Sequence, residues 1–189
     1  MTADTGGTTT LNVTGADTFN ASGVITANVI DFSGLDAAAT GNTVNMAVAA
    51  ASVTSIKGSA GNDVLKGDAK STIEGGAGND NITGGSGNDT LHGDEGKDTI
   101  TTGAGSDTVK GGDGDDTIVA AGNLTAADKI DGGEGTDTLS VATASLVTLQ
   151  GLSISDANKF NANFNSVETL AVSDALDTTG DDFDLGYLT

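Results

Sequence analysis

The chain has 189 residues, with 27 Asp and Glu against 7 Lys and Arg and a net charge of −20. This acidic excess excludes a protein that binds the nucleic-acid backbone and disfavours docking on an anionic membrane surface. The absence of Cys excludes disulfides and thiolate metal sites, and no apolar run approaches the ~20 residues that a transmembrane segment needs.

Residues 1–57 carry little charge and are predicted to form short β-strands separated by Gly, Asn and Ser turns. Ala47–Ala51 also fits a helical turn, and Gly15–Phe19 fits either a decayed repeat fragment or a plain β-turn with an Asx cap. Because the last of these strands runs directly into the first repeat, we interpret the segment as earlier turns of one solenoid. The predicted strands are Thr8–Val13, Val24–Phe32, Thr43–Val48 and Val53–Ile56.

Residues 58–140 repeat a nine-residue frame, which is clearest in GGAGNDNIT at Gly75–Thr83 and GGSGNDTLH at Gly84–His92. Gly recurs in the first, second and fourth slots, Asp in the sixth and an aliphatic residue in the eighth. The second copy is one residue short and lacks the sixth-slot Asp, and the eighth copy is three residues too long. The nine repeats are Gly58–Lys66, Gly67–Glu74, Gly75–Thr83, Gly84–His92, Gly93–Thr101, Thr102–Lys110, Gly111–Val119, Ala120–Asp131 and Gly132–Ser140.

Each slot has a physical purpose. Gly in the first, second and fourth slots allows positive φ angles, which turn backbone carbonyls toward one point. The sixth-slot Asp adds a charged oxygen ligand, and the eighth-slot residue points to the opposite side of a short strand, into a core. The predicted core residues are Leu65, Ile73, Ile82, Leu91, Ile100, Val109, Ile118, Ile130 and Leu139.

Residues 141–189 lose the glycine pattern, so we divide the chain into segments 1–57, 58–140 and 141–189. Strands are predicted at Leu146–Leu152 and Val167–Val172. Ser155–Phe164 fits a short helix whose Phe160 and Phe164 would plug the end of the solenoid. We also expect the chain to be a piece of a longer protein.

The nonapeptide register resembles the RTX (hemolysin-type calcium-binding) family, whose consensus is GGxGxDxUx. The resemblance implies an all-β fold, a right-handed parallel β-roll or β-solenoid in which two repeats make one turn. It also implies that each Asp bridges successive Ca²⁺ ions, that carbonyls of the first four slots complete each ligand sphere, and that the protein leaves the cell by type I secretion.

The resemblance therefore assigns ligands by slot. The carboxylate ligands are Asp63, Asp80, Asp89, Asp98, Asp107, Asp116, Asp128 and Asp137. The backbone ligands are Gly58, Ala60, Gly75, Gly76, Ala77, Gly78, Gly84, Gly85, Ser86, Gly87, Gly93, Asp94, Glu95, Gly96, Thr102, Gly103, Ala104, Gly105, Gly111, Gly112, Asp113, Gly114, Gly133 and Gly135.

With two repeats per turn, stacked loops are two repeats apart, so odd and even repeats form separate columns. The odd column has an Asp in every repeat, from Asp63 to Asp137, and should hold four sites. The even column offers a complete site between Asp89 and Asp107, a further one that uses Asp128, and an incomplete one beside Lys70. We predict five or six Ca²⁺ ions in total, distributed unequally between the two columns.

Nothing in the sequence indicates catalysis, because the only histidine, His92, fills a variable slot and no nucleophile is marked. We expect a structural calcium-binding protein that folds on Ca²⁺ outside the cell. The Thr, Ala, Val and Asn-rich flanks resemble RTX surface-layer proteins, so self-association in a surface lattice is the favoured role. The alternatives are the RTX tail of a secreted protease or lipase, and a segment of an RTX adhesin or toxin.

Overall fold

The computed structural model describes part of the chain, and within that part it contains strands and turns but no helix. No helix there is long and apolar enough to cross a membrane. The described residues are 10–12, 18–20, 29–34, 43–45, 54–67, 69–120, 124–125, 127–142 and 164–172.

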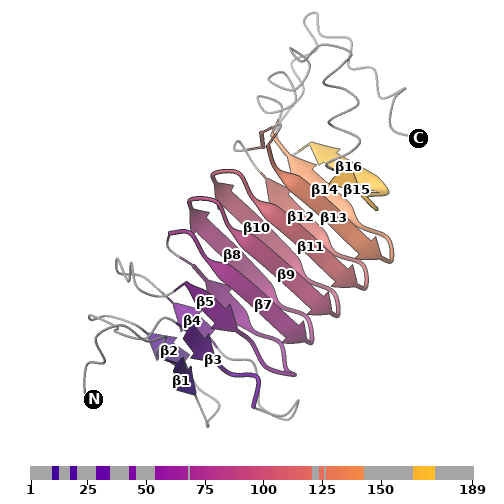
Figure 1. The fold of residues 1–189 in the computed structure, drawn as a ribbon. Helices are drawn as coiled ribbons and strands as arrows, with labels where there is room; N and C mark the ends of the chain where they lie inside the picture. The colour runs from indigo at the N-terminus through magenta and orange to yellow at the C-terminus, as the bar shows by residue number, and fades with distance from the viewer. Residues whose placement is uncertain are drawn as a thin grey trace, which may run out of the picture.

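Successive strands alternate between two eight-stranded sheets, which we call sheet A and sheet B. Figure 1 shows the strands lying side by side along one axis, from the indigo N-terminal strands to the yellow C-terminal pair. Sheet A contains, in spatial order, β1 (Thr10–Asn12), β3 (Val29–Asp31), β5 (Ser55–Lys57), β7 (Thr72–Ala77), β9 (Thr90–Glu95), β11 (Thr108–Asp113), β13 (Lys129–Glu134) and β15 (Phe164–Asn165). Sheet B contains β2 (Thr18–Asn20), β4 (Thr43–Asn45), β6 (Val64–Lys66), β8 (Asn81–Ser86), β10 (Thr99–Ala104), β12 (Thr117–Ala120), β14 (Thr138–Val141) and β16 (Thr169–Val172).

All strand pairs are parallel, and neighbours within a sheet come from repeats two apart. Ile100 on β10 pairs with Ile82 on β8 and with Ile118 on β12, so equivalent slots of alternate repeats lie side by side. The odd repeats supply sheet B and the even repeats supply sheet A. This arrangement confirms the all-β parallel solenoid with two repeats per turn.

The core is a thin layer between the two sheets, built from the eighth-slot residues. Because neighbouring residues of a strand point to opposite faces, only alternate side chains enter this layer. All nine predicted core residues are buried, with at most 2% of their surface exposed. The two degenerate repeats keep this contact through Ile73 and Ile130, which explains how the solenoid continues past them.

The N-terminal strands extend the same two ladders. On sheet B, Phe19 pairs with Val44, which pairs with Leu65 of the first repeat. This register puts Phe19 in line with the eighth-slot residues and favours the decayed-repeat interpretation of Gly15–Phe19. The alternative helical turn at Ala47–Ala51 lies outside the described residues.

The C-terminal strands close the array. β16 falls within the predicted strand Val167–Val172, whereas Leu146–Leu152 lies outside the described residues. The predicted helix Ser155–Phe164 is wrong at Phe164, which begins strand β15 and pairs with Ile130. Its remaining residues are outside the described part of the chain. Phe164 packs half-buried against the core because it continues the ladder of eighth-slot residues on sheet A.

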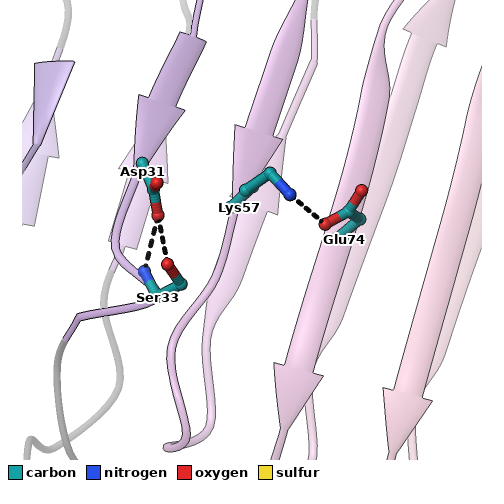
Figure 2. Close-up of polar contacts among 4 residues, drawn as sticks. All are labelled: Asp31, Ser33, Lys57 and Glu74. Atoms are coloured by element: carbon teal, nitrogen blue, oxygen red, sulfur yellow. Dashed lines mark hydrogen bonds and ion pairs between the residues drawn. The ribbon is translucent and has the colours of Figure 1, made fainter. Parts of the chain in front are cut away.

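Figure 2 shows the polar contacts where the N-terminal strands meet the repeats. Lys57 Nζ on β5 lies 2.7 Å from Glu74 Oε2 on β7. The hydrogen bond and charge of Glu74 raise the pKa of Lys57, whereas hydrogen bonds from Ser33 lower the pKa of Asp31. An exposed pair contributes at most about 1 kcal/mol, so this contact helps to align β5 with β7 but adds little to the core.

Candidate calcium sites

The sixth-slot residues lie where the chain turns into the next strand, and they stack into two columns. Loops that lead from sheet A to sheet B carry the five-Asp column, Asp63, Asp80, Asp98, Asp116 and Asp137. Loops that lead from sheet B to sheet A carry the three-Asp column, Asp89, Asp107 and Asp128. This column begins at Ser71 because the second repeat lacks the sixth-slot Asp. All eight Asp side chains are buried.

In seven of these residues, from Asp80 onward in one column and from Asp89 onward in the other, one carboxylate oxygen joins neighbouring loops. In the five-Asp column the backbone N–H of one Asp donates to Oδ1 of the next, at 2.7 Å from Asp63 to Asp80, 2.7 Å from Asp80 to Asp98, 2.8 Å from Asp98 to Asp116 and 2.8 Å from Asp116 to Asp137. The three-Asp column repeats the pattern, at 2.7 Å from Ser71 to Asp89, 2.9 Å from Asp89 to Asp107 and 2.7 Å from Asp107 to Asp128. The carboxylates are therefore fixed in place by the stacked backbone.

The other carboxylate oxygen is buried without a partner at five positions. Among the described residues, nothing donates to Oδ2 of Asp80, Asp89, Asp98, Asp116 and Asp137. A buried charged oxygen without a hydrogen bond is strongly unfavourable unless a cation compensates it. The loops therefore hold five oxygens that are prepared for a positively charged ligand.

Burial has a direct effect on the acidity of these groups. It raises the pKa of Asp80 to about 7, and the charges of Asp98 and Asp63 add to the effect. Burial, with the charge of a neighbouring Asp in the column, raises the pKa of Asp89 and Asp116 to about 6 each. Burial likewise raises the pKa of Asp98, Asp107 and Asp137.

The free oxygens face a cradle at the first slot of their own repeat. A Cβ built on Gly84 would lie 2.6 Å from Asp89 Oδ2 and would also collide with the carbonyl oxygen of Thr102, two repeats later. Gly75, Gly93, Gly111 and Gly132 show the same arrangement. A carboxylate oxygen and a carbonyl oxygen from the stacked loop therefore converge wherever the first-slot Gly leaves room.

The first-slot glycines differ from the expectation based on φ. Positive φ occurs at second-slot and fourth-slot glycines, for example 108° at Gly76 and 114° at Gly78, but at none of the first-slot glycines of the repeats. Where the first slot is Gly, as at Gly75, Gly84 and Gly93, a Cβ would have no space. The strand ladder also skips this slot: Thr83 pairs with Thr101 and Gly85 with Gly103, but Gly84 has no partner in the ladder.

The predicted backbone ligands lie in these loops and in the strand ends beside them. The side chains of Asp94, Glu95 and Asp113 are exposed, so they contribute no carboxylate to the buried cradles. The third-slot carbonyls of Glu95 and Asp113 each accept a backbone hydrogen bond of 2.8 Å, from Gly78 and Gly96 respectively. These carbonyls join successive loops, whereas the first-slot carbonyls face the carboxylates.

The surroundings of Asp63, Asp107 and Asp128 differ from those of the other five sixth-slot Asp residues. Oδ2 of Asp63 accepts hydrogen bonds from the backbone N–H of Ser59 at 2.6 Å and from its hydroxyl at 3.0 Å. Oδ2 of Asp128 accepts one from the backbone N–H of Thr125 at 2.6 Å. Asp107 has a Thr, Thr102, in the first slot of its repeat, so a Cβ occupies that position.

A family model for the RTX calcium-binding nonapeptide repeat matches the chain in four copies, at residues 54–69, 71–100, 92–123 and 125–141. The repeat region belongs to the RTX calcium-binding family. No curated protein and no solved structure matches the chain. The RTX assignment agrees with the two-sheet fold and with the slots that the loops use.

The RTX loops fit calcium by their donor chemistry. Ca²⁺ takes six to eight oxygen ligands at about 2.3–2.6 Å, from carboxylates and backbone carbonyls alike. Within the described residues, no three His, Cys, Asp or Glu side chains gather closely enough to hold a metal ion. The carboxylates would therefore need carbonyl oxygens to complete a site, and the first-slot carbonyls converge on them from the stacked loop.

Sequence reasoning missed Glu168, which continues the five-Asp column beyond the RTX repeats. The backbone N–H of Asp137 donates to Glu168 Oε2 at 2.8 Å, as each earlier Asp in the column donates to the next. Glu168-Thr169-Leu170 repeats the pattern of Asp137-Thr138-Leu139, with Glu in place of Asp. This match could have identified Glu168 from the sequence, but the residues around it lack the glycines of the repeat.

Replacing Gly93 with Ala should destabilise the calcium-bound protein by about 1–3 kcal/mol, the usual cost of overpacking. The new Cβ would collide with Asp98 Oδ2 and with the carbonyl oxygen of Gly111. Urea unfolding in saturating calcium measures the effect. Gly34→Ala is the control, because its Cβ meets no atom of the described residues within 4 Å. Equal stability of the two variants would contradict the cradle.

Without calcium, the fold should become more stable as the pH falls from 8 to 5. The pKa of Asp80 is about 7 in the folded chain and about 3.9 in an unfolded one, so the folded state binds its proton more tightly. Stability therefore rises as the pH falls through about 7 and continues to rise towards 4. Far-UV circular dichroism of calcium-free protein measures this, above the pI of about 4.1. A loss of β-structure on acidification would contradict the raised pKa values.

Proposed function

We propose that this chain is a calcium-dependent structural segment of a bacterial cell-surface assembly, exported by type I secretion and folded outside the cell. The observation that carries the proposal is the stack of carboxylates in which five buried Oδ2 atoms have no hydrogen-bond partner among the residues that the structure describes. Such a stack is unfavourable in water alone, and it becomes favourable when cations lie between the loops.

Four of the five Oδ2 atoms face a carbonyl of another RTX repeat. We expect calcium to bind at these four positions first. They are Oδ2 of Asp80, Asp98 and Asp116 in the five-Asp column and of Asp89 in the three-Asp column. At Asp63 and Asp128, calcium has to replace hydrogen bonds from Ser59 or Thr125. Ions at these two loops bring the proposed total to five or six.

The chain's own residues explain why folding depends on calcium. Below calcium saturation, burial keeps water from the carboxylates of Asp80 and Asp116, and each of them also faces the charges of neighbouring Asp residues in its column. When bound, calcium would supply the positive charge that neutralises these carboxylates. Because each repeat contacts its neighbours in the solenoid, ordering one loop prepares the next, and folding should be cooperative.

The calcium affinity that we propose for these loops supports folding outside the cell. Flexible all-oxygen sites of extracellular modules have dissociation constants of about 10⁻⁴–10⁻³ M. The loops would then remain empty at cytosolic calcium levels, and the chain would be exported unfolded. The absence of Cys is consistent with a fold that calcium, rather than disulfides, stabilises.

The role in a surface assembly is supported by the flanks. Strands β1 to β5 and β15 to β16 continue the sheets of the RTX region, so the flanks extend one solenoid. Their Thr, Ala, Val and Asn-rich composition resembles the bodies of RTX surface-layer proteins. We therefore propose that the chain contributes a stiff rod, and that it associates with copies of itself.

A calcium titration followed by far-UV circular dichroism tests this function, with magnesium as the control. We expect a largely unfolded chain in chelator at pH 7.5, a cooperative gain of β-structure with calcium, and no equal response to magnesium. An array that is already folded in chelator would contradict calcium-dependent folding. Electron microscopy of the calcium-bound protein then tests self-association, since ordered sheets support a surface assembly and separate monomers oppose it.

A further inference from the structure

The turn between β15 and β16 lies outside the nonapeptide repeats, yet it copies their geometry. On sheet A, β15 pairs with β13, and on sheet B, β16 pairs with β14. From Ser166, whose carbonyl takes the first-slot position, to Glu168 the turn has three residues, whereas an intact RTX repeat has six from its first slot to its sixth. It nevertheless stacks on the loop that contains Asp137, because the backbone N–H of Thr169 donates to the Asp137 carbonyl at 2.9 Å.

Asp137 directs one carboxylate oxygen, Oδ2, toward this turn. Its side chain is 0% exposed, and its Oδ2 has no hydrogen-bond partner among the described residues. A Cβ on Gly132 would collide with this oxygen and with the carbonyl oxygen of Ser166. The same two kinds of oxygen converge at Gly93, where the carbonyl comes from Gly111. Ser166 therefore provides the carbonyl that the next RTX repeat would provide.

Glu168 occupies the sixth-slot position of this turn. Its Oε2 accepts the hydrogen bond from Asp137 that Oδ1 of an Asp accepts elsewhere in the column. Its longer side chain compensates for a turn that is shorter than an RTX loop. Glu168 is exposed, unlike the buried Asp residues, so water can complete a ligand sphere at this end of the column.

We propose that Asp137, Glu168 and the carbonyl of Ser166 form a further calcium site, which closes the five-Asp column outside the RTX repeats. The inference rests on the proposed function, because it requires the same ion. The site ties β15 and β16 to the array, so the C-terminal strand pair docks only when calcium is present. Calcium then controls the order of a segment that contains no nonapeptide.

The test counts calcium ions by native mass spectrometry in the wild-type chain and in Glu168→Gln. Gln keeps an oxygen that accepts the hydrogen bond from Asp137 but removes the charge. We expect the variant to bind one ion fewer than the wild type. Glu134→Gln is the matched control, because Glu134 is an exposed residue of the neighbouring loop. It should bind as many ions as the wild type.

Hydrogen exchange in calcium gives the second measurement. Glu168→Gln should lose protection in residues 164–172 and keep it in β7 to β11. An unchanged ion count, or the loss of every ion, would overturn the site. If the wild type binds calcium and only the variant result fails, the proposed function stands without this site. If the wild type binds no calcium, both are wrong.

Discussion

Replacing Asp98 with Asn should remove two calcium ions and raise the calcium concentration at the folding midpoint by roughly tenfold or more. Asp98 lies in the middle of the five-Asp column, where its Oδ1 accepts a hydrogen bond from the backbone N–H of Asp80 and its buried Oδ2 has no partner in the described part of the chain. One carboxylate therefore faces the loops on both sides. Native mass spectrometry counts the ions, and circular dichroism during a calcium titration gives the midpoint.

The control for this variant is Asp113→Asn. It makes the same change of charge in a neighbouring strand, but the Asp113 side chain is exposed and lies in a third slot. We expect it to keep every ion and to shift the midpoint little. If Asp98→Asn kept all of its ions and its order, the assignment of the sixth-slot carboxylates as bridging ligands would be wrong.

Replacing Ile100 with Ala should destabilise the calcium-bound protein by about 2–5 kcal/mol. Ile100 is fully buried and lies between Ile82 and Ile118 in the ladder of sheet B. The core is only one layer thick, so a cavity at this position has few neighbouring side chains that can move into it. Urea unfolding at saturating calcium measures the loss, with the ion count determined on the folded variant.

Val64→Ala is the matched control, since Val64 is 46% exposed and precedes the buried Leu65 on the same strand. An exposed aliphatic residue away from special features should change stability by no more than about 0.5 kcal/mol. Equal losses for the two variants would contradict a core in which the eighth-slot residues are the main contacts of the repeat region.

The fold could be predicted because a repeat constrains every copy in the same way. Ile73 and Ile130 show this best: each lies in a repeat whose loop is damaged, yet each is aliphatic and buried. The core slot is needed by both neighbouring turns, so it persists where the calcium loop does not. The parallel pairing of repeats two apart was implied by the resemblance to the RTX family, and the ladders confirm it.

What the sequence did not reveal depends on contacts between loops. Glycine in the first slot looked like a conformational requirement, whereas the structure shows that the stacked carbonyl and the carboxylate leave no space for a Cβ. Phe164 fitted a helical pattern with Phe160, but pairing with Ile130 makes it a strand residue. Glu168 gave only the weak signal of Glu168-Thr169-Leu170, because its place in the column depends on a contact with Asp137, 31 residues earlier.

The most direct test of calcium binding between the stacked loops is a crystal structure of the chain grown in calcium, with anomalous difference density used to locate the ions. We expect ions in line along the two columns, each in contact with Oδ2 of a buried Asp and a first-slot carbonyl from the loop above. Density confined to exposed acidic side chains, with both columns empty and the solenoid intact, would contradict this account.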